Sequence, residues 1–461
     1  MAFLDFYIQA TGSDLNAGTD NTATPTAIPS ATCVVSSGTI TFTGASGAFT
    51  GVSVGNWVSL YNSADTVSRF TGQVATNDNT IITILYASGT GYSTTGLGLA
   101  TGLTTGGAAG AVICRVGGPW ASFAITNAGG AMNGTTPSLS GALTANDGLR
   151  VNVLAGTTYA ISTTSITLPV GLINKPILWR GYYAAIGDID NYANVSGTFV
   201  SPSGATLAGA SRPLITTISS TQFILSNYTH LWNLEFTGPG IGTASTQAAV
   251  VFSGTGDIKA LRCRFTSTSR SVIASTSTGT CTFEACYVTG SSGGAAMQLA
   301  GYANVNACTF RNGSLNLFTT TANVTFCIFD LGTGSNTLFI SHQLANGALN
   351  VSNCTFYGGG TLGQDGIWLR YNPVSGRIAN NLFVSLSGYG VNGNGVTHNV
   401  MLINNAFVNC SSGNTNSIQP TAIIGSITEI SAPFANAISH DFTLATGAAS
   451  RQAGMPGQFE V

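Results

Sequence analysis

Charged side chains are scarce in this chain. Only 7% of its 461 residues are Asp, Glu, Lys or Arg, against about 25% in a typical soluble protein, and Lys175 and Lys259 are the only lysines. A net charge of −2 leaves no basic stripe, so we expect no nucleic-acid partner. Disorder by composition is excluded too, because 44% of the residues are apolar.

Two kinds of apolar segment are also missing. Gly, Ser, Thr and Asn interrupt every hydrophobic stretch before it reaches about 18 residues, so we expect no membrane insertion. The first ten residues, MAFLDFYIQA, have no basic start and no apolar core of secretory length. The sequence therefore predicts a protein made in the cytoplasm, without a signal peptide.

A six-residue pattern recurs eight times in the second half of the chain. It reads apolar, two mostly small or polar residues, Cys or Asn (Leu in the first copy), any residue, and an aromatic or apolar residue. The copies are 231–236 (LWNLEF), 260–265 (ALRCRF), 283–288 (FEACYV), 305–310 (VNACTF), 324–329 (VTFCIF), 351–356 (VSNCTF), 378–383 (IANNLF) and 402–407 (LINNAF). Their last residues lie 19 to 29 positions apart. Such spacing predicts a solenoid with one coil per copy, and short strands in coils of this size predict a parallel β-helix.

Five of the nine cysteines occupy one position of this repeat: Cys263, Cys286, Cys308, Cys327 and Cys354. Stacked coils would place them about 4.8 Å apart in a column. An odd total and a single shared position argue against a disulfide framework. We expect buried, reduced thiols that fill the core, with no metal site, because a linear column offers no tetrahedral ligand set. Asn381 and Asn405 replace Cys in the last coils and are expected to hydrogen-bond along the axis.

Motifs outside the repeat carry a family resemblance. Residues 6–19 (FYIQATGSDLNAGT), 117–128 (GGPWASFAITNA), 146–159 (NDGLRVNVLAGTTY) and 176–182 (PILWRGY) follow one another in that order. This order resembles the amino-terminal part of right-handed parallel β-helix proteins of the pectate-lyase-like superfamily. The resemblance implies that a short helix within 117–131 caps the open end of the solenoid. It also implies that residues 439–447 (SHDFTLATG) form a last coil.

Residues 30–115 interrupt that order and predict a separate module. Alternating runs at 39–43, 57–61, 70–75 and 80–86 are separated by turn residues and indicate a small antiparallel β-module. We therefore divide the chain into four parts. They are residues 1–29 (first strand and start of the cap), 30–115 (the inserted module), 116–148 (capping helix and linker) and 149–461 (the parallel β-helix).

Acidic residues do not form an evident catalytic pair. Glycoside hydrolysis needs two carboxyl groups about 5–9.5 Å apart, and no two acids share a repeat position in adjacent coils. Glu235 is instead expected to face Arg264 as an outward ion pair. Asp188 and Asp190 could share a face and hold a cation, but a turn after a strand explains them more simply. The four histidines, at 230, 342, 398 and 440, lie in different contexts and predict no general base.

One cluster has the composition of a carbohydrate site. Asp365, Trp368, Arg370 and Tyr371 combine aromatic rings with groups that hydrogen-bond hydroxyls. The composition is a weak signal for a glycan-binding site there, without a cofactor or a metal. Rung and turn residues of the solenoid would also explain them.

Three classes of function fit these features. The first is a structural protein of a bacteriophage particle (spike, fibre or capsid decoration), made in the host cytoplasm and able to attach to host surface glycans. The resemblance implies a homotrimer that contacts other virion proteins of the capsid or tail. The second is a polysaccharide lyase or glycoside hydrolase, free or as a tailspike. The third is a bacterial surface adhesin, which would need an export route.

Overall fold

A computed structural model describes most of the chain. The described residues are 3–19, 25–36, 39–65, 70–85, 109–126, 148–195, 198–201, 203, 205–239, 248–267, 273–275, 278–290, 295–330, 338–344, 346–359, 364–371, 374–418, 423–425, 427–428, 433–436, 441–446 and 448. They form two compact units. Unit 1 comprises Met1–Tyr159, Ile166–Asp188 and Leu225–Leu231, and unit 2 comprises Ala160–Ser165, Ile189–Ile224 and Trp232–Val461.

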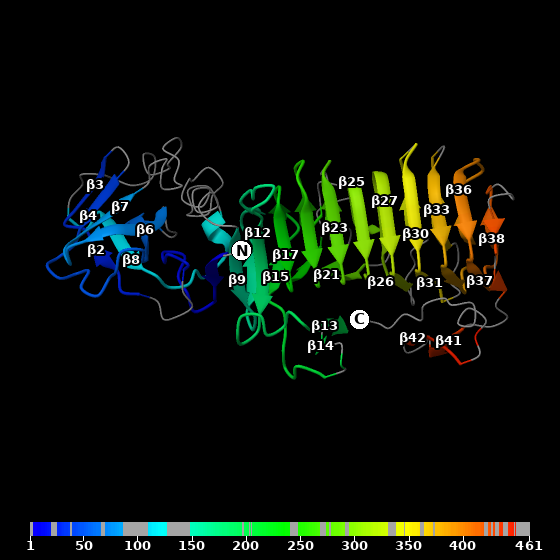
Figure 1. Ribbon diagram of the computed structural model, residues 1–461, viewed down its shortest axis with the longest axis horizontal. Helices are drawn as coiled ribbons and strands as arrows, with labels where there is room; N and C mark the ends of the chain where they lie inside the picture. The colour runs from blue at the N-terminus through cyan, green and yellow to red at the C-terminus, as the bar shows by residue number, and fades with distance from the viewer. Residues whose placement is uncertain are drawn as a thin grey trace. The chain divides into compact units, whose positions relative to one another are not determined.

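The described residues are almost entirely β-structure, and unit 2 is built of three-sided coils of parallel strands. This confirms the parallel β-helix. We name each side after a strand of one coil: the β32 face, the β33 face and the β34 face. Two twelve-residue strands, β25 (Ala295–Asn306) and β27 (Ser314–Thr325), bend from the first of these faces to the second. The strands of the β33 face lie side by side in Figure 1, with those of the β34 face along one edge.

The strand bounds of the three faces are as follows. The β32 face holds β19 (Val250–Phe252), β22 (Ile273–Ser275), β29 (Leu338–His342), β32 (Asp365–Leu369), β35 (Tyr389–Asn392) and β38 (Gly413–Asn416). The β33 face holds β20 (Ile258–Leu261), β23 (Thr280–Glu284), β30 (Ala348–Ser352), β33 (Ser375–Ala379), β36 (Asn399–Ile403) and β39 (Ile423–Ile424). The β34 face holds β15 (Leu214–Thr217), β18 (Glu235–Gly238), β21 (Arg264–Ser267), β24 (Tyr287–Thr289), β26 (Thr309–Arg311), β28 (Ile328–Asp330), β31 (Thr355–Tyr357), β34 (Leu382–Val384), β37 (Ala406–Val408) and β40 (Ile427–Thr428).

The repeated six-residue pattern turns the chain from the β33 face onto the β34 face. Its third residue adopts the left-handed conformation in all eight copies, with φ between 51° and 57°. Asn tolerates this conformation best, and Asn occupies the position in four copies, at 233, 353, 380 and 404. The main-chain ladder continues through the turn. For example, Asn380 N donates to Ile403 O at 2.9 Å, and Leu382 N donates to Cys354 O at 2.9 Å.

Identical side chains stack inside the solenoid. The phenyl rings of Phe310, Phe329, Phe356, Phe383 and Phe407 form one column, with centroids 4.7–5.0 Å apart and planes within 7° of parallel. Each such pair contributes about 0.5–1.5 kcal/mol beyond the area that it buries. The five repeat cysteines form a second column and are buried and free, as the sequence predicts. Burial raises the pKa of the Cys263, Cys286, Cys308 and Cys327 thiols well above the usual value.

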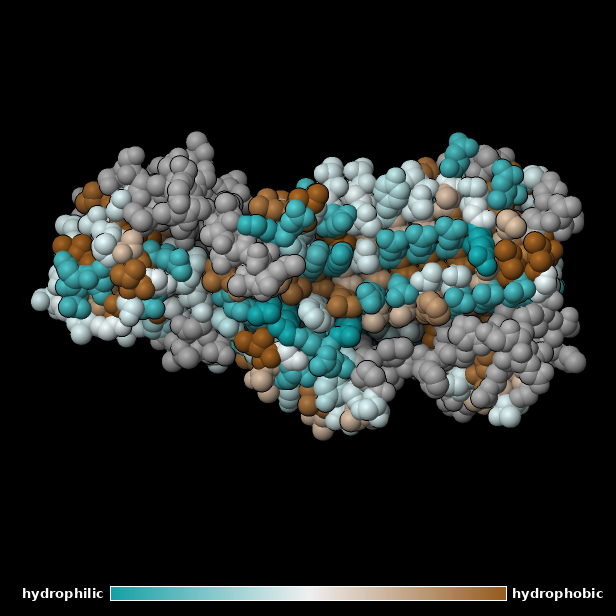
Figure 2. Space-filling model, in the orientation of Figure 1, coloured by the Kyte–Doolittle hydropathy of each residue, from teal (hydrophilic) through white to brown (hydrophobic). Residues whose placement is uncertain are grey.

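Outward side chains are mostly uncharged. On the β33 face Thr282, Asn304, Asn323, Asn350 and Arg377 occupy one register position in successive coils. Asn323 donates to Asn304 at 2.9 Å and Asn350 donates to Asn323 at 3.0 Å, so neighbouring amides satisfy each other. Figure 2 shows hydrophilic side chains in rows that run across the strands of this face.

The end of the solenoid differs from the expectation. β42 (Asp441–Leu444) does not form a last coil but pairs antiparallel with β41 (Phe434–Asn436). The reason is apolar burial: Phe434, Phe442 and Leu444 pack against the outer side of the β34 face, including Ile328 and Leu382. The coils are also interrupted upstream by an antiparallel hairpin, β13 (Ala193–Val195) with β14 (Thr198–Val200). Residues 441–446 therefore do not form the last coil expected over 439–447, and a hairpin lies between the coils upstream.

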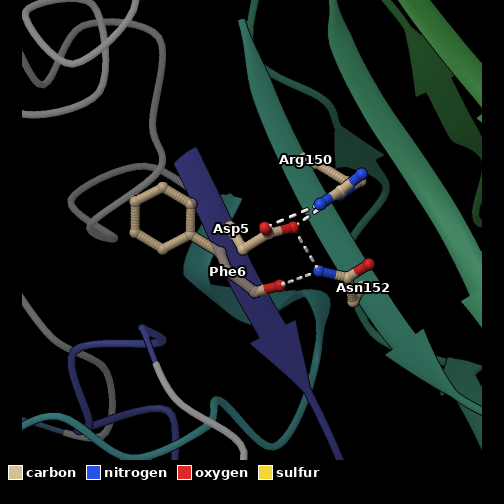
Figure 3. A network of polar contacts seen from close by, with 4 residues as sticks. All are labelled: Asp5, Phe6, Arg150 and Asn152. Atoms are coloured by element: carbon tan, nitrogen blue, oxygen red, sulfur yellow. Dashed lines mark hydrogen bonds and ion pairs between the residues drawn. The ribbon is translucent and has the colours of Figure 1, made fainter. Parts of the chain in front are cut away.

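Unit 1 holds the first coil strands. β1 (Leu4–Ile8) and β12 (Ile177–Tyr182) pair in parallel with the two edges of β9 (Leu149–Leu154). Arg150 makes a two-pronged ion pair with Asp5 (Nε–Oδ1 2.5 Å, Nη2–Oδ2 2.7 Å). Asn152 Nδ2 also donates to Asp5 Oδ1 at 2.8 Å, and Figure 3 shows this network across the two strands. A short strand, β11 (Ile166–Thr167), belongs to the same unit. Strands β10 (Thr158–Ile161), β16 (Phe223–Leu225) and β17 (Thr229–Trp232) contain the points where the chain passes between the units.

Two of the resembling motifs meet around Trp120, which is fully buried. Its indole N–H donates to Asn16 O at 2.8 Å, and its ring stacks on Phe6 at 5.1 Å. Gly18 has a φ of 80°, and a Cβ there would overlap the indole, so only glycine fits.

The capping element is shorter than expected. Within the described residues the segment 117–131 forms one four-residue 3₁₀-helix, η1 (Phe123–Thr126), and residues 127–131 lie outside them. Asp14 accepts hydrogen bonds from Ala121 N and Ser122 N, which fixes the start of this turn. Phe123 packs on Trp179 (5.5 Å) and Tyr159 (5.7 Å) of unit 1.

The module in unit 1 is a seven-stranded sheet in the order β2-β8-β5-β6-β7-β4-β3, with antiparallel pairs. Its strands are β2 (Ile28–Pro29), β3 (Thr32–Ser36), β4 (Thr39–Thr43), β5 (Trp57–Asn62), β6 (Phe70–Asn77), β7 (Ile81–Leu85) and β8 (Val112–Val116). All four predicted runs are strands of this sheet. It has its own apolar core, which includes Phe42, Leu60, Phe70, Ile84 and Cys114.

Candidate functional site

Strand β32 positions the predicted carbohydrate cluster on the outer surface of unit 2. Ile367 and Leu369 are fully buried in the solenoid. Side chains alternate along a strand, so Trp368 and Arg370 project from the opposite side. Burial of Ile367 and Leu369 therefore places Trp368 and Arg370 on the outer surface. All four sequence-predicted residues lie within seven positions of the chain.

Arg370 connects the aromatic side chains of the cluster. Its guanidinium carbon lies 5.3 Å from the ring centroid of Trp368 and 5.2 Å from that of Tyr371. Such contacts contribute about 0.5–1 kcal/mol at exposed sites. Arg370 Nη1 also donates to Gln343 Oε1 at 3.2 Å. The guanidinium thus holds two rings and an amide of the adjacent coil in one arrangement.

Asp365 is held on the other side of Trp368. Its Oδ1 accepts from Tyr389 N at 2.7 Å, and its Oδ2 accepts from Asn392 Nδ2 at 2.8 Å. Asn392 is the register partner of Trp368 in the next coil. The structure therefore brings Asp365, Trp368, Arg370 and Tyr371 together on one surface.

The sequence reasoning missed several polar neighbours in adjacent coils. Asn416 Nδ2 donates to Asn392 Oδ1 at 3.0 Å, and Asn394 Nδ2 donates to Arg370 O at 3.3 Å. A signal for them exists: Asn392 and Asn416 are 24 residues apart, the same separation as Phe383 and Phe407 of the repeat. Residues that are one repeat apart occupy equivalent positions in neighbouring coils. Counting coils from Trp368 would therefore have identified this row of amides.

Phe318 extends the aromatic surface. It follows Leu317, whose register partner is His342, just as Gln343 follows His342 and Arg370 follows Leu369. Phe318 thus occupies the position of Gln343 and Arg370 one and two coils away. Its side chain is 41% exposed, and that of Tyr371 is 46% exposed. The sequence reasoning did not connect it with the cluster because Phe318 and Arg370 lie two coils and 52 residues apart.

Other candidate residues have structural explanations. Glu235 and Arg264 are register partners with Nε–Oε1 at 3.8 Å, which confirms the predicted ion pair. Asp188 accepts from the main-chain N–H groups of Tyr183, Ala184 and Ala185 and therefore shapes a turn.

Asp190 does not share a site with Asp188. It is buried and accepts a hydrogen bond from Asn233 Nδ2 at 3.0 Å. Among the described residues no group of three or more His, Cys, Asp or Glu side chains is arranged to hold a metal ion.

The histidines are distributed as the sequence suggests. His342 and His398 are fully buried. His398 accepts a hydrogen bond from Val374 N at 3.2 Å and contacts Gly393 O at 2.9 Å. His230 is partly buried, and His440 lies outside the described residues.

Carboxylates on the described coil strands do not face one another. Within the described strands, the register partners of Glu235, Glu284, Asp330 and Asp365 in adjacent coils are Leu, Arg, Asn or Tyr residues. Strand neighbours lie about 4.8 Å apart, so these are the pairs that could reach hydrolytic distance by stacking. In the part of the chain that the structure describes, no helix is long and apolar enough to cross a membrane.

Comparisons with known proteins find distant similarities only. No protein-family model matches the chain, and no curated protein sequence does. A solved structure of ORF18 from Geobacillus virus E2 is 13% identical with a TM-score of 0.35, over 61% of this chain and 53% of that one. This chain thus spans about half the length of that viral protein.

Two glucanase structures are similar over more of the chain. The catalytic domain of a GH87 α-1,3-glucanase, in complex with nigerose, is 11% identical with a TM-score of 0.29, over 85% of this chain and 92% of that one. The catalytic unit of the GH87 α-1,3-glucanase from Streptomyces thermodiastaticus is 12% identical with a TM-score of 0.27, over 90% and 96%. Similarity at this level does not bear on activity.

Proposed function

We propose that the protein is a β-helix component of a bacteriophage particle that attaches to host surface glycans through the β32 face. The observation that carries the attachment is the contiguous surface of Trp368, Arg370 and Tyr371 with Asp365 and the neighbouring amides. Aromatic rings provide flat apolar faces for sugar rings, and amide and carboxylate groups bond hydroxyls.

The phage assignment rests on sequence features. These are the resemblance of the amino-terminal motifs to the pectate-lyase-like superfamily, the low charge, the ladder of reduced thiols and the inserted β-module.

Trimeric association and contact with capsid or tail proteins belong to the same proposal. Light scattering on the purified chain tests the trimer: a mass of three chains supports it, and a monomer at micromolar concentration contradicts it.

Binding of glycans to the full chain tests the attachment. On a glycan array we expect at least one bound glycan, and titration of that glycan should show about tenfold or greater weakening in Trp368→Ala and in Tyr371→Ala. Tyr302→Ala is the matched control, because Tyr302 is 52% exposed and lies on β25. Circular dichroism should show that all three variants remain folded.

Two outcomes would contradict the attachment. One is the absence of any bound glycan across the array. The other is equal weakening in Tyr302→Ala and the cluster variants, which would indicate a non-specific contribution of exposed tyrosine. Cleavage is not part of the proposal, because the described strands place no two carboxylates in register with each other.

A further inference from the structure

We infer that the ligand of the β32 face is an uncharged glycan chain that runs along the solenoid axis from Phe318 to Asn416. This inference rests on the proposed function and specifies the chemistry of the ligand. It follows from how the charged, amide and aromatic groups of the face are already engaged.

The two charged groups of the cluster have opposite signs, and both contact other groups of the protein. Both carboxylate oxygens of Asp365 accept hydrogen bonds, from Tyr389 N and from Asn392 Nδ2. The Arg370 guanidinium lies against two rings and donates to Gln343. A site for an acidic sugar needs a cation whose donors point to the ligand, as in a bidentate arginine–carboxylate pair. Here the charge of Arg370 is offset by Asp365 in the same cluster, and that carboxylate would repel an acidic ligand.

The polar side chains that link other coils to the cluster are neutral amides. They are Gln343, which follows β29, Asn392 and Asn394, in and after β35, and Asn416, in β38. An amide provides both donors and acceptors, which suits hydroxyl or acetamido groups that also do both. Coil spacing of about 4.8 Å places the Asn392 and Asn416 amides in a row parallel to the axis. A ligand that repeats along one direction can use such a row at successive units.

The aromatic groups define the other end of the path. Phe318 lies two coils before Arg370 and Tyr371, a distance of about 10 Å along the axis. Its side chain is 41% exposed, and contact of this apolar ring with water is unfavourable unless a ligand covers the ring. The apolar side of a sugar ring can cover it by dispersion and burial. The path from Phe318 through Trp368 to Asn416 therefore spans five coils, those of β27, β29, β32, β35 and β38 in order.

The test is an array that contains neutral, N-acetylated, uronate, sialylated and sulfated glycans, followed by titration of the strongest binder at low and high NaCl. We expect a neutral or N-acetylated glycan to bind most strongly. Its affinity should change less than about twofold when the ionic strength rises from about 0.02 M to about 0.5 M, because screening acts only on charge. Phe318→Ala should weaken binding about tenfold, although Phe318 lies outside the sequence-predicted cluster.

Different results separate the inference from the proposed function. A strongest binder that is acidic, with an affinity that falls steeply with salt, would overturn the inference and leave glycan attachment intact. Unchanged affinity in Phe318→Ala, with loss in Trp368→Ala, would overturn the extended path. Tyr302→Ala serves again as the control for an exposed ring on β25. The absence of any bound glycan would instead refute the proposed function.

Discussion

One buried column of the solenoid is built from two kinds of side chain. Cys occupies it in five successive coils, and Asn follows at 381 and 405. In the Cys part the main-chain N–H of Cys286 donates to Cys308 Sγ at 3.4 Å. In the Asn part the N–H of Cys354 donates to Asn381 Oδ1 at 2.9 Å, and Asn381 Nδ2 donates to Val351 O and to Asn405 Oδ1, both at 3.0 Å.

The difference separates two ways to satisfy the same turn. A thiol fills the volume and makes weak hydrogen bonds, so its contribution is mostly packing. An amide makes several bonds of normal length to neighbouring coils, and their loss would leave buried groups unsatisfied. We therefore expect the Asn coils to depend on polar groups and the Cys coils on shape. The following predictions test that distinction.

Asn381→Leu should have the largest effect on stability. It removes the acceptor for Cys354 N and the donor to Val351 O while keeping a similar volume. We expect a loss of about 3–4 kcal/mol in the free energy of unfolding, since at least two buried groups lose their partners. Chemical denaturation measures it. Asn350→Leu, an outer-face amide, is the control and should cost about 0.5 kcal/mol or less; a similar loss in both variants would show that burial does not decide the difference.

His342 extends the comparison to a buried polar group without such bonds. Its column neighbours are Leu317 and Leu369, and neither ring nitrogen makes a well-formed hydrogen bond to a described residue. Burial lowers the pKa of His342 to about 4, and the main chain of Thr319 opposes this only in part. The folded state thus binds fewer protons than the unfolded state between about pH 4 and 6.5. The stability should be full above pH 6.5 and fall by about 3 kcal/mol as the pH drops toward 4.

His342→Leu tests this assignment. The variant should lose most of the acid dependence, measured as denaturation midpoints between pH 7 and pH 4, and should match or exceed the wild type at pH 5. His398→Leu is the contrasting variant, because it removes two buried hydrogen-bond contacts and should destabilise at every pH. An unchanged acid slope in His342→Leu would assign the slope to other groups.

Cys327→Ser should have a smaller effect than the Asn substitution. A hydroxyl replaces a thiol of larger volume in a packed column, and we expect a loss of about 1–3 kcal/mol. Cys410→Ser is the control, since Cys410 is only partly buried and lies outside the column. A Cys327→Ser variant as stable as wild type would mean that the column tolerates polarity, which removes the contrast with the Asn coils.

The sequence predicted the periodic parts of the fold well. The repeat placed the coils, the buried thiol column and the Glu235–Arg264 pair, because each depends on neighbours one repeat away. It did not predict the hairpin of β41 and β42. The apolar patch that this hairpin covers forms only when the register between strands brings Ile328 and Leu382 onto the outer side of the β34 face. The helix expected over 117–131 is a 3₁₀ turn at 123–126 within the described residues, and its start is fixed by Asp14, 107 residues before Ala121.

The candidate site was predicted in part for the same reason. Asp365, Trp368, Arg370 and Tyr371 are close in sequence and share one strand and its end, so their composition was enough to group them. Phe318, Gln343 and Asn416 join them only through the stacking of coils of unequal length. Their membership depends on the register between strands, which emerges only when positions are compared one coil at a time.

The smallest expected effect is the reaction of the native thiols with Ellman's reagent, which tests the packing of the Cys coils directly. Burial raises the pKa of the Cys263, Cys286, Cys308 and Cys327 thiols well above the usual value and that of Cys410 to about 11, so almost none of these thiols is ionised at pH 8. Ellman's reagent should leave the native chain essentially unmodified over an hour, with Cys410 the first to react, and should titrate all nine thiols in denaturant. Rapid reaction of several thiols in the native state would mean that the Cys coils open readily. In that case the amides of Asn381 and Asn405, and not the packing of the thiols, would be what keeps the column closed.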